Sequence, residues 1–165
     1  MSDPQTLPHT MKAAAVDRFG PPSALTLHEV PVPKPGPREV LIAIDTAGVG
    51  SWDSSIRDGS WRKPGPARFP LVPGVDGAGI VVAKGARVRR FRNGERVYAY
   101  EFGNRQGGFY AEFAAAASTH VARVPKGTNL RDAGPPRETA RRPARDRRTA
   151  SGVDRAAADV RCRRT

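Results

Sequence analysis

The sequence has 165 residues, a formal net charge of +12 and one cysteine, Cys162. A domain of this length can bury a hydrophobic core. A single cysteine cannot close an intramolecular disulfide, and no apolar run approaches the roughly 20 residues that span a bilayer. These features exclude a disulfide-stapled domain and a helical membrane protein. The first residues lack the pattern of a secretory signal, so we expect a reduced, cytoplasmic setting.

The positive charge is spread unevenly along the chain. Residues 133–165 contain ten Arg against four acidic residues, which is half of the net surplus. The body, residues 1–132, is therefore only mildly basic, and its charge does not require a nucleic-acid partner. Val153 and Val160 are the only large aliphatic residues in this C-terminal segment. We expect residues 133–165 to form a disordered tail, because they bury too little apolar surface to offset the entropy of ordering.

The rest of the chain alternates short apolar segments with proline and glycine turns. Residues 1–10 are polar and contain two prolines, which predicts a disordered leader. The segments that follow predict about six to eight short strands. They fall at residues 12–16, 25–32, 39–49, 80–83, 96–102, 108–117 and 120–124. This profile predicts a mainly β domain, a compact barrel or sandwich.

One short helix is expected at residues 51–58. Ser51 or Asp53 can cap it, and Gly59 can end it. Trp52 and Ile56 are four residues apart and therefore fall on one helical face.

A turn rich in proline and glycine leads into the strand at residues 80–83. Pro70 and Pro73 restrict φ, while Gly74, Gly77 and Gly79 relax the backbone limits that a Cβ imposes. Binding loops on a rigid β scaffold often have this composition, and so do turns that only pack against a neighbouring backbone. Because the glycines precede a strand and not a helix, they do not form a dinucleotide fingerprint.

Seven motifs, in order and with characteristic spacing, resemble a known family. The resemblance covers residues 11–132 and is to the N-terminal GroES-like catalytic domain of the medium-chain dehydrogenase/reductase superfamily, above all its zinc-independent, quinone-oxidoreductase-like branch. The motifs are K-A-A-A-V at Lys12, E-V-L-I-A-I-D-T-A-G-V-G at Glu39, S-I-R-D-G at Ser55, P-G-V-D-G-A-G at Pro73, G-E-R-V-Y at Gly94, G-G-F-Y-A-E-F at Gly107 and V-P-K-G at Val124.

The resemblance implies a two-domain, NADPH-dependent oxidoreductase. This domain would form one wall of the active-site cleft, and a following Rossmann domain would bind the cofactor. Hydride would pass from the nicotinamide to a quinone or an α,β-unsaturated carbonyl. Zinc-dependent relatives have Cys where this chain has Gly50 and His where it has Val75, so we expect no catalytic zinc. Zinc-independent relatives commonly have Asn at the position of Gly50 and Tyr at that of Ser55, and this chain has neither.

The expected cleft residues are those that the resemblance places near the nicotinamide. They are Gly50, Ser51, Trp52, Asp53, Arg57, Val75, Asp76 and Tyr100. Trp52 is either a wall of the substrate pocket or a core residue. Arg57 is either a contact to a phosphate or carbonyl or, as we favour, a solvated helix residue.

The sequence departs from the family after Asp132, where a helix leading into the Rossmann domain would be expected. Arg, Pro and Ala dominate when a GC-rich gene is read in the wrong frame, so our hypothesis is a frameshift and a truncated family member. Such a chain would have little or no reductase activity by itself. It would also expose an apolar face where the cofactor domain docks, through which it could self-associate.

Two other classes of function remain open. One is a nucleic-acid-binding β-barrel with an arginine-rich arm that orders on binding. The aromatic residues, however, are not interleaved with Arg and Lys on one predicted strand face, as a stacking platform requires. The other is a non-catalytic interaction module that pairs through the exposed face.

Overall fold

The computed structural model describes residues 7–61, 65–102 and 107–133. The expected C-terminal tail, apart from Ala133, and the first six residues of the expected leader lie outside these ranges. The elements in chain order are β1 (Thr10–Ala15), η1 (Pro22–Ala24), β2 (Thr26–Pro31), β3 (Glu39–Ala47), α1 (Ser51–Asp58), β4 (Asp76–Lys84), β5 (Arg96–Tyr100), β6 (Phe113–Ala117), η2 (Ser118–His120), β7 (Val121–Arg123) and α2 (Leu130–Ala133).

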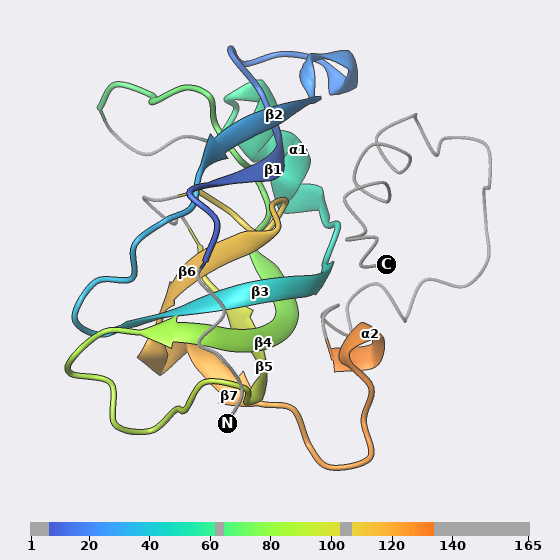
Figure 1. The fold of residues 1–165 in the computed structure, drawn as a ribbon. Coiled ribbons are helices and arrows are strands. Elements are labelled where there is room, and N and C mark those ends of the chain that lie inside the picture. Colours follow the sequence, from blue (N-terminus) through green and yellow to red (C-terminus); the bar gives the residue numbers. More distant parts are fainter. Residues whose placement is uncertain (1–6, 62–64, 103–106, 134–165) are drawn as a thin grey trace, which may run out of the picture.

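The strands form two antiparallel sheets. A five-stranded sheet has the order β6-β3-β4-β5-β7, and β1 pairs with β2 in a separate hairpin. The pairing of β3 with β4 shifts register between Leu41 and Ile42 and again between Ile44 and Thr46. Such bulges bend a strand and increase its twist. The larger sheet therefore curls into a half-barrel, with the hairpin lying across one side of it (Figure 1).

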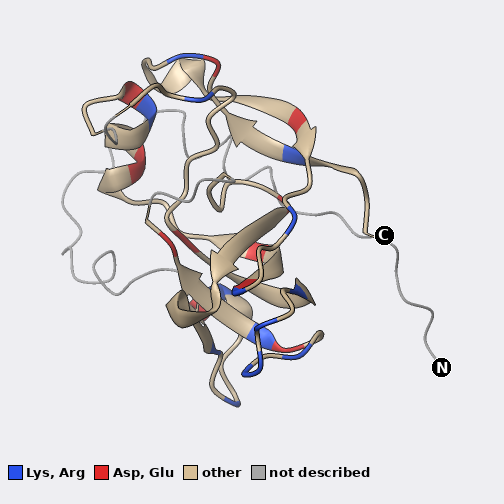
Figure 2. Cartoon of the chain, turned by 90° about the vertical axis from the view of Figure 1, so that its left-hand side faces the viewer, with Lys and Arg blue, Asp and Glu red and all other residues tan. Residues whose placement is uncertain are grey.

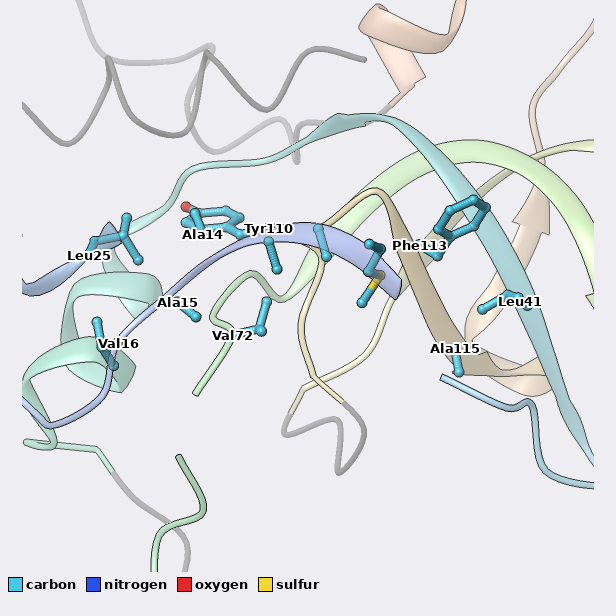
Figure 3. Close-up of a cluster of buried hydrophobic side chains, with 12 residues drawn as sticks. Ala14, Ala15, Val16, Leu25, Leu41, Val72, Tyr110, Phe113 and Ala115 are labelled. Carbon is cyan, nitrogen blue, oxygen red and sulfur yellow. The ribbon is translucent and has the colours of Figure 1, made fainter. Parts of the chain in front are cut away.

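Two hydrophobic clusters lie on opposite faces of β3, because alternate residues of a strand point to opposite faces. Val40 and Ile42 pack inside the curled sheet with Phe91 and Val97. Leu41 points the other way, into a cluster shared with β1. Figure 3 shows this second cluster, with Leu41 and Ala115 at one end and Leu25, Ala14 and Tyr110 at the other.

The predicted mainly β fold is confirmed, and α1 has the predicted bounds. The strand predicted at residues 80–83 is longer than expected, because β4 begins at Asp76 and includes Gly77 and Gly79, which were predicted to lie in the turn before it. Two further segments differ from expectation. β1 already begins at Thr10, and His9 accepts a hydrogen bond from the N–H of Val32 at 3.0 Å, so the described end of the expected leader is ordered. β6 covers only the second half of the strand predicted at 108–117. Its first half instead bonds to the turn before β4, with Tyr110 N–H donating to the Pro73 carbonyl at 3.1 Å.

Candidate active site

The site is built around the start of α1. The Asp53 carboxylate, in the first turn, accepts a hydrogen bond from the N–H of Gly50 at 2.7 Å. An acidic group here satisfies one of the free N–H groups of the helix and interacts favourably with the helix dipole. Gly59 ends the helix with a left-handed φ of 80°. The helix thus turns Asp53 inward and leaves its neighbour Trp52 half exposed.

The turn before β4 is held against α1 by the same carboxylate. Gly74 N–H donates to Asp53 Oδ1 at 3.1 Å. Gly74 has a φ of 99°, and a Cβ there would lie 2.8 Å from the backbone nitrogen of Phe109 and 2.7 Å from the ring of Tyr110. Only glycine fits both this conformation and this close approach. The turn therefore serves packing, and its Gly74 N–H is already used within the protein.

Asp76, the first residue of β4, is a second buried carboxyl group. It is 6% exposed, and its Oδ2 has no hydrogen-bond partner among the described residues. It lies so close to Gly48 that a Cβ on that glycine would be 2.3 Å from Oδ2. Burial, and secondarily the negative charge of Asp53, raise the pKa of Asp76 to about 6. Asp76 therefore holds a proton at mildly acidic pH.

Asp53 is buried like Asp76, but its carboxyl group accepts more hydrogen bonds. Burial raises its pKa, while hydrogen bonds from Gly50, Tyr110 and Gly74 oppose that rise. These donors stabilise the charged form, so Asp53 is the carboxylate of the pair and Asp76 is the group that takes up the proton.

Four aromatic residues form a cluster beside these carboxyl groups: Trp52, Trp61, Tyr100 and Phe102. Phe102 is at the centre, with ring centroids 5.5 Å from Trp52, 4.2 Å from Trp61 and 6.4 Å from Tyr100. Tyr100 pairs with Asp76 across β5 and β4, which brings the aromatic cluster and the buried carboxyl group to the same end of the sheet.

The structure brings most of the expected cleft residues together. Gly50 and Ser51 are exposed at the start of α1, and Val75 is buried directly before Asp76. Trp52 is 49% exposed, so the alternative in which it is a core residue is wrong.

Arg57 departs from both interpretations of it. It is buried, its Nε donates to the Gly20 carbonyl at 3.2 Å, and its own carbonyl accepts the Gly20 N–H. Arg57 is therefore neither solvated nor free to bind a phosphate. It faces the turn before η1 because the helix rotates it away from Trp52.

Three participants were missed in the sequence: Trp61, Phe102 and Gly48. Trp61 and Phe102 come from segments far apart in the chain, and no local pattern links them. For Gly48 the sequence signal was the glycine itself. Gly48 directly follows β3, and its N–H donates to the carbonyl of Asp76 at the start of β4.

Within the described ranges, no three His, Cys, Asp or Glu residues come together to hold a metal ion. None of the helices in the same part of the chain is long and apolar enough to cross a membrane.

Basic residues gather at the opposite end of the half-barrel, around the loop between β4 and β5 (Figure 2). Arg87, Arg89, Arg90 and Arg92 are all exposed there. The aromatic residue between them, Phe91, is fully buried, so no ring is available for stacking beside these charges. The described residues thus keep the exposed aromatic cluster apart from the basic loop.

The curled antiparallel sheet with two short helices is the architecture of a GroES-like domain. The family model described as "Alcohol dehydrogenase GroES-like domain" matches residues 36–126. The chain belongs to this family, within the medium-chain dehydrogenase/reductase superfamily.

Similar proteins include both quinone oxidoreductases and alcohol dehydrogenases. The quinone oxidoreductase of Lama guanicoe is 41% identical over 117 residues, which cover 70% of this chain and 34% of that protein. An alcohol dehydrogenase of Rhizobium meliloti is 45% identical over 89 residues, or 53% of this chain and 25% of that one. This chain thus spans about a third or less of the length of these relatives.

Solved structures give the same result. The quinone oxidoreductase from Coxiella burnetii matches 75% of this chain with a TM-score of 0.66 and 26% identity, over 40% of its own length. A mycobacterial protein complexed with NADPH matches 73% of this chain with a TM-score of 0.64 and 31% identity, over 35% of its own length. The resemblance to quinone oxidoreductases is confirmed.

Proposed function

We propose that this chain supplies the substrate-facing wall of a zinc-independent, NADPH-dependent oxidoreductase that reduces a quinone or an α,β-unsaturated carbonyl. The observation that carries the proposal is the half-exposed Trp52 lying next to the buried Asp53 and Asp76 at one end of the sheet. Quinone oxidoreductases are among the similar proteins, which supports this substrate class.

Bound NADPH would supply a hydride. Trp52 and Tyr100 fit a flat ring, because both leave about half of the side chain exposed. The turn at Gly74 does not fit the diphosphate, since its N–H is bound by Asp53 and it leads into a strand. Holding the dinucleotide therefore falls to a nucleotide-binding domain outside the described residues. In this proposal the residues of the described wall orient the substrate.

The proposal of zinc independence rests on the residues at two positions, 50 and 75. Gly50 has no side chain, and Val75 offers only an aliphatic one that is buried. Neither can donate to a metal, so polarisation of the substrate carbonyl is left to hydrogen-bond donors.

A domain exchange tests the proposal. Residues 11–132 replace the corresponding domain of the Coxiella burnetii quinone oxidoreductase, and oxidation of NADPH by a naphthoquinone is followed. We expect the chimera to reduce the quinone and the 165-residue chain to show little or no activity by itself. A folded chimera that binds NADPH but does not oxidise it would contradict the proposal.

A further inference from the structure

The loop between β4 and β5 ends in a tight turn whose central residues are Asn93 and Gly94. The Glu95 N–H donates to the Arg92 carbonyl at 3.3 Å, which closes the turn, and Gly94 has a left-handed φ of 87°. Both central residues are exposed. Beyond the chain neighbours of Gly94, no atom of the described residues lies within 4 Å of a Cβ built there, so the turn is open to water on that side.

An asparagine that is followed by a glycine is chemically labile. When the Gly94 nitrogen loses its proton, it can attack the side-chain carbonyl carbon of Asn93, because glycine has no side chain to obstruct the approach. A C–N bond forms and closes a cyclic imide, and the side-chain nitrogen leaves as ammonia. Water then opens the imide at either of its carbonyl carbons, which gives aspartate or isoaspartate at position 93.

The fold occupies the nitrogen that this reaction needs. The Gly94 N–H donates to the Val81 carbonyl of β4 at 2.8 Å, and the Val81 N–H donates to the Glu95 carbonyl at 3.0 Å. The Gly94 N–H is therefore directed at β4, and attack on Asn93 requires this bond to break.

Arg123, the last residue of β7, holds the turn in place. Its guanidinium donates to the Glu95 carboxylate at 3.2 Å from Nε and at 3.3 Å from Nη2, and also to the Arg90 carbonyl. The guanidinium carbon lies 5.2 Å from the centre of the Phe91 ring, close enough for a cation–π contact. One side chain thus clamps the chain on both sides of the turn, and we call these contacts the Arg123 clamp.

The turn can open without unfolding of the domain. Phe91 and Val97 lie on either side of it and are fully buried, so they anchor the chain. The bonds to Val81 lie directly beyond the pair Ile80 and Arg96, at the end of the ladder between β4 and β5. Bonds at the end of a ladder open at a lower free energy than those in the core. The turn can therefore separate from Val81 while the half-barrel stays folded.

We propose that Asn93 is a gated deamidation site, which stays intact while the Arg123 clamp holds the turn and is converted when the turn opens. Its two products differ in consequence. Aspartate leaves the backbone unchanged and adds a negative charge to a loop rich in arginine. Isoaspartate lengthens the backbone by a methylene group, so the Gly94 nitrogen no longer meets the Val81 carbonyl and the turn stays open.

Conversion is measured on the full chain at neutral pH, both folded and unfolded in guanidinium chloride. Mass spectrometry of proteolytic peptides detects replacement of the amide by a carboxyl group, and enzymatic carboxyl methylation detects isoaspartate. Asn129 is the internal reference, because the side chain of Leu130 after it obstructs the attack. We expect the folded chain to convert Asn93 at least about tenfold more slowly than the unfolded chain, since the turn must open first.

Arg123→Gln removes the clamp without changing the Asn-Gly sequence. It should speed conversion in the folded chain about three- to tenfold, because an exposed ion pair and a hydrogen bond are lost, and it should change nothing in the unfolded chain. Arg96→Gln is the matched control, since Arg96 is exposed near the turn but its Nη2 donates to the Thr128 carbonyl at 2.6 Å. The control should convert at the rate of the natural chain, and circular dichroism checks that both variants are folded.

Equal rates in the folded and unfolded natural chain would overturn the gate, and equal effects of Arg123→Gln and Arg96→Gln would overturn the role of the clamp. Absence of conversion in the unfolded chain would show that Asn93 is not a modification site. Chains that carry isoaspartate should also unfold at a lower denaturant concentration than Asn93→Asp. Equal midpoints would contradict the inference that isoaspartate keeps the turn open.

Discussion

The carboxylate of Asp53 accepts the N–H of Gly74 at 3.1 Å, across 21 positions of sequence. It also accepts the N–H of Gly50 at 2.7 Å. One buried group thus joins the start of α1 to the turn that leads into β4, and it holds Trp52 at a fixed place relative to Asp76. The link satisfies the buried backbone donor of Gly74 and the partly buried donor of Gly50.

Asp53→Ala should lower the free energy of unfolding by about 2–4 kcal/mol, because both N–H groups lose their acceptor. Urea denaturation followed by tryptophan fluorescence measures the change. Asp45→Ala is the control, since Asp45 is exposed on β3. We expect the control to stay within about 0.5 kcal/mol of the natural protein. Similar losses in the two variants would show that the link does not stabilise the fold.

Asp76 makes stability depend on pH. Its pKa in the folded protein is about 6, above the ordinary value of 3.8, so the folded state binds the proton more tightly than the unfolded state. This contribution is complete below about pH 4 and is lost as the pH rises through about 6. Asp53, with its raised pKa, acts in the same direction.

Asp76→Asn should remove most of this dependence, and near pH 8 it should raise the free energy of unfolding on the order of 2 kcal/mol relative to the natural protein. Denaturation at a series of pH values tests this, with Asp45→Asn as the control. Parallel stability curves for the natural protein and Asp76→Asn would mean that Asp76 does not hold the proton.

Gly74 is required for a different reason. Gly74→Ala places a Cβ 2.8 Å from the backbone of Phe109 at a positive φ, whereas Gly94 has a similar φ of 87° and no atom within 4 Å of an added Cβ. Both substitutions carry the backbone strain, but only the first adds a collision. Gly74→Ala should therefore cost about 2 kcal/mol more than Gly94→Ala in thermal denaturation. Equal losses of stability in the two variants would show that the close approach of Phe109 to Gly74 does not require a glycine there.

Local patterns predicted the elements better than the site. The β-branched residues of β3 and the cap and Gly59 around α1 act over a few residues, so the start of β3 and both ends of α1 could be predicted from the sequence. The burial of Arg57 against Gly20 depends on how α1 is rotated in the fold. The meeting of Trp52 with Phe102 depends on tertiary packing in the same way, since neither residue's neighbours in sequence encode it.

Zinc independence can be tested by restoring the two missing donors. Gly50→Cys has room, because a Cβ there would lie 3.8 Å from Asp53 Oδ2, and Val75→His supplies an imidazole. We expect the double variant to bind zinc more tightly than the natural chain, which should retain none in stoichiometric amount after dialysis. Metal content measured by mass spectrometry checks this. A stoichiometric zinc ion in the natural chain would contradict the assignment to the zinc-independent branch.

The most direct measurement follows the hydride itself. The chimera that carries residues 11–132 is supplied with NADPH deuterated at the transferring position of the nicotinamide and with an α,β-unsaturated ketone, and the product is analysed by mass spectrometry. The proposed function predicts a saturated ketone with one deuterium bound to carbon, formed more slowly in Trp52→Leu. A product without deuterium, from a chimera that binds the cofactor, would contradict it.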